Sequence, residues 1–310
     1  MFRLVENRKW YFLLSALVIV PGLIAMIYST VTTGLPFKLA IDFTGGSIWE
    51  LKFEQPILPG DLREVFVDAG YSDTAVTTVS DGKTAVVRLK PIDEDVKLSL
   101  MNAIKTKFGD GVTEVQFSAV GPAIGQEVTQ AAGLAVLAAA VAILVFLILA
   151  FRKVPHPARF GVSAIAAMVH DILVTTGIFS ICSLFFGWEA DALFLTALLT
   201  VIGFSVQDTI VVFDRIRENT PKYRGEPFSQ IANRSLLETL HRSLATQLNA
   251  LFVMASLLLF GGATIKQFIA VMFYGLISGT YSSIFNAVPI LAGWEERDLL
   301  GLKAGRTETA

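Results

Sequence analysis

Two acidic residues lie within runs of the sequence that are otherwise apolar. Asp208 stands in the run Gly203-Phe-Ser-Val-Gln-Asp-Thr-Ile-Val-Val-Phe-Asp214, and Asp171 follows His170 in an earlier run. If Asp214 marks the edge of a membrane-spanning helix, Asp208 lies about 9 Å deeper, at a rise of about 1.5 Å per residue. A carboxylate near the centre of such a helix costs about 2.5 to 3.5 kcal/mol. A cation, a wet cavity or a bound proton must offset that cost.

Arg242 is the candidate cation. It precedes Thr246 and Asn249 by four and seven residues, so the three side chains share one helical face. Consecutive helices are usually neighbours, which predicts that this polar face meets Asp208 and the adjacent Gln207.

His170 and Asp171 add a second polar pair near the middle of its own apolar run. Together with Asp208 and Arg242, they predict a proton path in which each group exchanges a proton for a charged partner as the helices move.

Structural explanations compete with this hypothesis. Arg242 can extend to the lipid headgroups. His170 can be an ordinary buried hydrogen-bonding residue, and Asp171 can pair with a hydroxyl such as that of Thr175. Asp208 is the hardest to explain structurally, because acids at this depth are rare. Asp214, near Arg215 and Arg217, is interpreted as a solvated helix end.

Other chemistry lacks support in the sequence. There is no phosphate-binding Gly-x-x-x-x-Gly-Lys motif, no His-Glu-x-x-His motif and no supported catalytic triad. The single cysteine, Cys182, allows neither a disulfide within the chain nor a cysteine metal cluster. The net charge of −2 gives no basic field for nucleic acid. We expect no catalytic residues, no metal and no cofactor, and an ion gradient as the energy source.

The composition predicts a membrane protein. Hydrophobic residues make up 53% of the 310 residues and charged residues 17%, against roughly 25% in soluble domains. A spanning helix needs about 20 mainly apolar residues. The first run has no Ala-x-Ala cleavage pattern and is interpreted as an uncleaved spanning helix. Six spans are predicted: Tyr11 to Tyr28, Thr129 to Phe151, Phe160 to Phe186, Ala192 to Phe213, Ser243 to Phe260 and Phe268 to Ala292.

The distribution of Lys and Arg predicts the orientation. Short loops rich in these residues stay in the cytoplasm. The basic loops follow the second and fourth spans, whereas the opposite short loops carry only Lys266. We therefore predict a cytoplasmic N-terminus and the first span over residues 1–34, and an extracytoplasmic domain over 35–120. Five further spans over 121–295 and a cytoplasmic tail over 296–310 follow, with the protein in the inner (plasma) membrane.

The extracytoplasmic segment has the pattern of an α+β domain. Its predicted elements are a strand at Ser47 to Phe53, a helix at Pro59 to Ala69, strands at Ala75 to Val79 and Thr84 to Leu89, a helix at Val96 to Phe108 and a strand at Val112 to Ser118. A turn at Ser80-Asp-Gly-Lys83 joins the middle strands. The order β-α-β-β-α-β is the ferredoxin-like arrangement. The predicted fold class is therefore an α-helical polytopic membrane protein with an α+β ferredoxin-like outer domain.

Six motifs, in order along nearly the whole chain, resemble those of the SecDF family of export proteins, and of its SecF members in particular. The family is itself similar to resistance-nodulation-division transporters. The motifs are Ile41-Asp-Phe-Thr-Gly-Gly-Ser-Ile-Trp-Glu50, Val120-Gly-Pro-Ala-Ile-Gly-Gln-Glu127, His170-Asp171, the run from Gly203 to Asn219, Asn233-Arg-Ser-Leu-Leu-Glu-Thr-Leu-His-Arg-Ser243 and Gly279-Thr-Tyr-Ser-Ser-Ile-Phe285.

The resemblance implies that Asp208 and Arg242 couple protons to movement. It implies SecD as a partner in a heterodimer, with the SecYEG channel and YajC or YidC nearby, and an outer domain that helps to hold an emerging preprotein. Two departures concern the proton route. Gln207 stands where the family usually has Asn, and Gln247 and Asn249 stand where it usually has Ser and Thr.

The predicted function is an auxiliary, non-enzymatic subunit of the protein translocase that uses the proton motive force with SecD, among membrane lipids. Two alternatives remain open. One is a proton-coupled exporter of small solutes or lipids. The other is a structural assembly factor whose buried charges only hold helices together.

Overall fold

The computed structural model describes residues 4–79, 82–152, 154 and 156–299. The chain forms two compact units, one of residues 39–133 and one of residues 1–38 together with 134–310.

The smaller unit is built around a four-stranded antiparallel sheet with the strand order β2-β3-β1-β4. Two helices connect these strands, so the order β-α-β-β-α-β and the α+β class predicted from the sequence are confirmed. Ser80 and Asp81 of the predicted turn lie outside the described residues. The elements are the short helix α2 (Ile41–Thr44), β1 (Gly46–Lys52), α3 (Pro59–Asp68), β2 (Ala75–Thr78), β3 (Thr84–Leu89), α4 (Glu94–Phe108) and β4 (Thr113–Val120).

Alternation along the strands places one face of the sheet in the core of this unit. Trp49 and Leu51 on β1 are fully buried and pack with Phe66 of α3. The indole Nε1 of Trp49 donates a hydrogen bond to Glu114 at 2.9 Å. Glu114 also forms an ion pair with Lys97. Burial lowers the pKa of Lys97, but the hydrogen bonds and negative charges of Glu114 and Glu94 outweigh burial and raise this pKa above its ordinary value.

The pair Gly45-Gly46 brings chain segments close together at the start of β1. Both residues have positive φ angles, 71° and 134°, which side-chain-bearing residues rarely adopt. A Cβ atom at Gly45 would lie 2.8 Å from the Cα of Pro122, at the start of the helix that follows β4. Glycine is therefore required here for both conformation and space.

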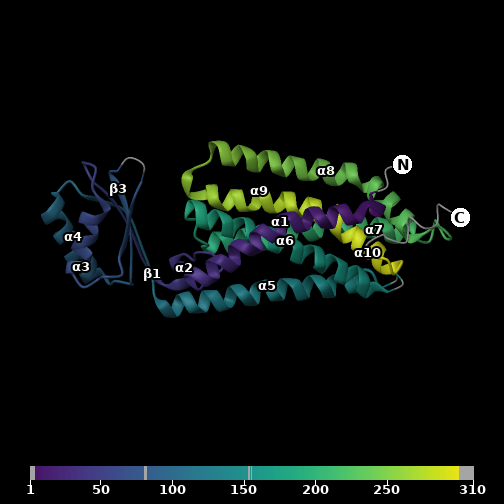
Figure 1. The fold of residues 1–310 in the computed structure, drawn as a ribbon, viewed down its shortest axis with the longest axis horizontal. Helices are drawn as coiled ribbons and strands as arrows, with labels where there is room; N and C mark the ends of the chain where they lie inside the picture. Colours follow the sequence, from purple (N-terminus) through teal and green to yellow (C-terminus); the bar gives the residue numbers. More distant parts are fainter. Residues whose placement is uncertain (1–3, 80–81, 153, 155, 300–310) are drawn as a thin grey trace. The chain divides into compact units, whose positions relative to one another are not determined.

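The larger unit is a helix bundle. Within the described residues, six helical segments are long and apolar enough to cross a membrane, as predicted. Helix α9 packs against α6, α7 and α8, and α1 packs against α6 (Figure 1). The bundle consists of α1 (Arg8–Thr33) after a 3₁₀ turn at Val5–Asn7, α5 (Pro122–Ala150), α6 (Pro157–Phe186), α7 (Ala192–Asn219), α8 (Phe228–Phe260), α9 (Ala263–Ser282), a π-helix (Ser283–Ala287) and α10 (Val288–Glu295).

Most helices extend several residues beyond the predicted spans, and two of them differ in further ways. Helix α8 begins at Phe228 rather than near Ser243, because Ile231 and Leu236 give its first turns a buried apolar face. The sixth span changes from α- to π-helix at Ser283. Pro289 follows and has no backbone N–H for an α-helical bond to the preceding turn, which accounts for the local change of register.

Two glycines of α9 allow close contact with α7 at the point where the two helices cross. A Cβ at Gly275 of α9 would lie 2.3 Å from a side-chain atom of Val201 on α7, and one at Gly279 would lie 3.2 Å from Ser205. Small residues of this kind let helices approach closely in lipid, where packing holds a bundle together. This crossing positions the polar side chains of α7 against those of α9.

Candidate functional site

Asp208 lies in the middle of the bundle on α7 and is only 5% exposed. Its Oδ2 accepts a hydrogen bond of 2.6 Å from Nε2 of Gln247 on the neighbouring α8. Gln247 is itself buried. Among the described residues, this neutral amide is the hydrogen-bond partner of the carboxylate.

Arg242 lies elsewhere. It is exposed on the surface of the single chain, and no ion pair joins it to Asp208 within the described residues. Arg242 lines a cavity of about 430 Å³ near the end of α7, together with charged side chains that are paired among themselves. Arg215 contacts Glu218 at 2.8 Å and Glu238 at 2.5 Å. The pairing of Arg242 with Asp208 therefore stays a prediction.

The other predicted polar residues also face outward. Gln207, Thr246 and Asn249 are all exposed on the surface of the chain. The hydroxyl of Thr246 donates to the backbone oxygen of Arg242 at 3.0 Å. Arg242, Thr246 and Asn249 do share one side of α8, as their spacing predicts, but it is a surface of this chain. We call these three residues with Gln207 the polar face.

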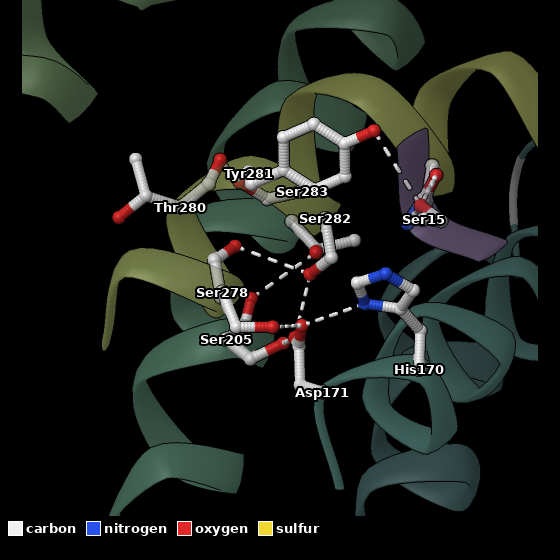
Figure 2. A network of polar contacts seen from close by, with 12 residues as sticks. Ser15, His170, Asp171, Ser205, Ser278, Thr280, Tyr281, Ser282 and Ser283 are labelled. Carbon is white, nitrogen blue, oxygen red and sulfur yellow. Dashed lines mark hydrogen bonds and ion pairs between the residues drawn. The ribbon is translucent and has the colours of Figure 1, made fainter. Parts of the chain in front are cut away.

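Asp171 is the centre of a second, fully buried site (Figure 2). Its Oδ2 accepts hydrogen bonds of 2.5 Å from Ser205 on α7 and 2.5 Å from Ser282 on α9. Its Oδ1 accepts one of 2.7 Å from Ser278 on α9 and lies 3.0 Å from Nδ1 of His170. Four donors from three helices thus stabilise negative charge on one carboxylate.

His170 connects this carboxylate to helix α1. Its ring stacks on Tyr281 with 5.9 Å between centroids. The hydroxyl of Tyr281 donates to the backbone oxygen of Tyr11 at 2.6 Å, and Ser15 on α1 donates to Asn286 of the π-helix at 3.3 Å. An ionised carboxylate only accepts hydrogen bonds, so Nδ1 of His170 is the donor to Asp171.

The sequence reasoning missed the serine donors. Thr175, the hydroxyl it offered for Asp171, has no hydrogen-bond partner among the described residues. Ser278 and Ser282 are four residues apart on α9, so helical spacing could have placed them on one face. Ser205 lies three residues before Asp208, so one segment of α7 carries contacts to both sites. Among the described residues there is no group of three or more His, Cys, Asp or Glu side chains that could hold a metal ion.

Comparison with known proteins identifies the family. Residues 100–297 match the family model for the C-terminal part of the protein export membrane proteins SecD and SecF, and residues 31–57 match the SecD/SecF GG motif. The chain is similar to protein translocase subunit SecF of Thermobaculum terrenum, with 46% identity over 97% of this chain and 96% of that one. The chain belongs to the SecD/SecF family. It is also 46% identical to SecF of Anaerolinea thermophila, over 95% of this chain and 94% of that one.

Solved SecDF structures share the fold. SecDF from Thermus, a translocon-associated membrane protein, superposes with a TM-score of 0.77 and 31% identity over 96% of the chain. SecDF in a super-membrane-facing form superposes with a TM-score of 0.65 and 29% identity over all of it. The chain spans only 39% and 40% of those two chains. This SecF-family chain therefore corresponds to one part of a larger SecDF protein.

Proposed function

We propose that this chain is an auxiliary subunit of the Sec protein translocase, and that it uses the proton motive force together with SecD to assist preprotein movement across the inner membrane. Membership of the SecD/SecF family supports the translocase role. The coupling to protons is carried by one observation, namely that Asp208 is buried in a spanning helix beside a neutral amide.

The environment of Asp208 suits reversible protonation. An ionised carboxylate at this depth costs about 2.5 to 3.5 kcal/mol, and one amide donor offsets only part of that cost. A bound proton removes the charge. A cation that moves in from the surface of the chain would neutralise it. Asp208 can therefore alternate between a protonated state and a paired state, with Arg242 as the cation.

The polar face supports a partner that completes this site. Arg242, Thr246, Asn249 and Gln207 are exposed on spanning helices, where contact with hydrocarbon is unfavourable. A second helical subunit that covers this face would bring its own polar groups to Asp208. SecD is the partner proposed here, because the similar SecDF chains contain an additional part of larger size. SecYEG, YajC or YidC, and the preprotein itself are the further partners of the proposal.

His170 and Asp171 form the second part of the proposed proton route. The support is geometric: Nδ1 of His170 is bonded to Asp171, whereas its Nε2 has no hydrogen-bond partner among the described residues. Ser205 and Asp208 link the two sites through α7. A proton crossing about 200 mV releases about 4.6 kcal/mol, close to the roughly 5.5 kcal/mol that inverts a 1:99 population.

The test is export measured after the preprotein has entered the channel. Membrane vesicles carrying the chain and SecD hold a preprotein halfway through, ATP is removed, and a proton gradient is imposed. We expect wild-type protein to complete export and Asp208→Asn to lose about 90% or more of the gradient-dependent rate, as raising the barrier of an essential step by about 1.4 kcal/mol or more would. Asp214→Asn, six residues along the same helix, is the matched control and should retain export.

Three outcomes separate the proposal from its alternatives. If Asp208→Asn keeps both its complex and its gradient-dependent export, the chain is an assembly factor. If the chain does not co-purify with the export channel, the result favours a proton-coupled exporter of small solutes or lipids over a translocase subunit. If a sodium gradient replaces the proton gradient, the coupling ion is sodium and the proton proposal is wrong.

A further inference from the structure

A cavity of about 270 Å³ lies between α1, α6 and α9, at the level of the Asp171 site. Three of its apolar lining residues, Leu14, Val18 and Ile277, are between 41% and 47% exposed, so the cavity opens on the surface of the bundle. His170, which also lines it, is residue 14 of the 30 in α6. The opening is therefore near the middle of a span and faces the hydrocarbon of the membrane.

Two residues that line this cavity have a buried polar atom without a partner in the described part of the chain, namely Nε2 of His170 and the hydroxyl of Tyr274. Nε2 of His170 is buried and makes no hydrogen bond within the described part of the chain. The His170 side chain as a whole is 10% exposed. Figure 2 shows this second ring nitrogen turned away from Asp171 and toward Ser15 and Tyr281, which also line the cavity. With Nδ1 donating to Asp171, Nε2 of the neutral ring is an acceptor that awaits a donor.

Three kinds of occupant can be compared. A lipid acyl chain suits the apolar walls but leaves Nε2 unsatisfied, which costs roughly 1 to 3 kcal/mol. Water satisfies Nε2, but a stable buried water needs two to four polar partners. The hydroxyls of Ser15, Ser278 and Tyr281 in this lining already donate to other groups. A carboxylic acid in its neutral form dissolves in hydrocarbon and carries the one O–H donor that Nε2 requires.

The cavity volume limits the size of that acid. It is far larger than the roughly 30 Å³ share of one water molecule and below the roughly 300 to 1,000 Å³ of typical small-molecule sites. It therefore accommodates one chain end rather than a two-chain lipid. We propose that the α1–α6–α9 cavity binds the carboxyl end of a single-chain fatty acid from the surrounding membrane, with the acid O–H donating to Nε2 of His170.

The chain offers a direct readout, because it has only three histidines, His156, His170 and His241. The full chain with its partner, labelled with ¹⁵N-histidine and held in lipid nanodiscs, is titrated with palmitic acid. We expect a saturable shift of the His170 ring nitrogens and none at the other two histidines. Methyl palmitate has the same chain without the O–H and should bind about tenfold more weakly, as expected for one lost hydrogen bond.

Substitutions locate the site. Val174→Trp fills the cavity and should abolish the saturable shift, whereas Val169→Trp, on an exposed part of the same helix outside the cavity lining, should preserve it. Val174→Phe is a smaller alternative, and the acid–ester comparison needs no variant.

Several results would overturn the proposal. Equal binding of acid and methyl ester would make the occupant an ordinary acyl chain. A non-saturable shift would indicate partition into the lipid only, and a shift that survives Val174→Trp would place the ligand elsewhere. His170 also belongs to the proposed proton route, so the two proposals are tested by different readouts. Ligand binding is read at the His170 ring nitrogens, and proton coupling is read from export by Asp208→Asn.

Discussion

The two buried acids of this bundle are held in very different ways. Asp171 has four hydrogen-bond donors, three of them serine hydroxyls, whereas Asp208 has the single amide of Gln247 among the described residues. The first arrangement fixes the position of the carboxylate. The second offers fewer donors to offset the cost of ionisation, which is why the proposed proton coupling is assigned to Asp208.

This contrast predicts unequal costs of substitution at the Asp171 site. Asp171→Ala leaves three hydroxyls and an imidazole without their acceptor and should cost about 3 to 5 kcal/mol of stability, as expected for breaking a buried polar network. Ser282→Ala leaves three donors in place and should cost about 1 kcal/mol. The midpoint of thermal unfolding can be measured in detergent from the rate at which a thiol reagent modifies Cys182, the only cysteine of the sequence, which is half-buried.

Two results would contradict this prediction. One is an Asp171→Ala protein as stable as wild type, which would mean that water replaces the carboxylate. The other is a Ser282→Ala cost equal to that of Asp171→Ala, which would mean that the network depends on one serine. Thr280→Ala is a useful control, because its hydroxyl bonds only the preceding turn of its own helix.

At the scale of the elements, α7 links the two acidic sites. It presents Ser205 to Asp171 and, three residues later, Asp208 to Gln247. It also contacts α9 closely at Gly275 and Gly279. A shift of α7 along α9 would therefore change the hydrogen bonds of both carboxylates. The π-helix after Ser282 adds a further irregular element beside the Asp171 network, as is frequent at functional sites.

Helices α1 and α6 approach each other closely at Gly22 and Gly177. A larger residue at this crossing is predicted to lower stability. A Cβ at Gly177 would lie 2.9 Å from the Cα of Gly22, and backbone atoms cannot move aside cheaply. Gly177→Val should therefore lower stability by about 1 to 3 kcal/mol through overpacking. The loss of stability should appear as a lower midpoint of thermal unfolding in the Cys182 reactivity assay.

Gly203→Ala is the matched control for that substitution. Gly203 also lies inside a spanning helix, but a Cβ there would have no heavy atom within 4 Å. Its midpoint should stay unchanged or rise, because alanine favours helix by up to about 1 kcal/mol. If both substitutions lower the midpoint equally, the α1–α6 crossing does not depend on the glycine pair.

At the scale of the whole molecule, the sequence predicted the features that depend on the local pattern of apolar and polar residues. The apolar runs predicted six spans, and period-two and helical spacing predicted the order of strands and helices in the smaller unit. The start of α8 at Phe228 was missed because its first turns are amphipathic rather than apolar. The strand order in the sheet follows from long-range pairing, which no local pattern shows.

For the polar sites, the ionisable residues could be predicted from the sequence, whereas the serine donors could not. Asp171, His170 and Asp208 could be found because an ionisable residue in an apolar run is costly. Ser205, Ser278 and Ser282 could not, because serine is common in spanning helices and little marks it as a ligand of an acid. The exposed position of Arg242 could not be foreseen either, since one sequence does not show which pairs form between chains.

The orientation of the whole chain gives the last prediction. If the six helices span the membrane, consecutive spans alternate in direction, and we predict that the domain between α1 and α5 lies on the opposite side from the basic loop between α7 and α8. The loop's Lys and Arg residues predict that it is cytoplasmic. In a Cys182→Ala background, Asp68→Cys on α3 should react with a membrane-impermeant maleimide applied from the outer side of intact inner membranes. Arg224→Cys in the loop should react only after lysis, and Cys182→Ala alone should not react. Labelling of Arg224→Cys but not Asp68→Cys in intact membranes would reverse the orientation and place the outer domain in the cytoplasm, away from any emerging preprotein.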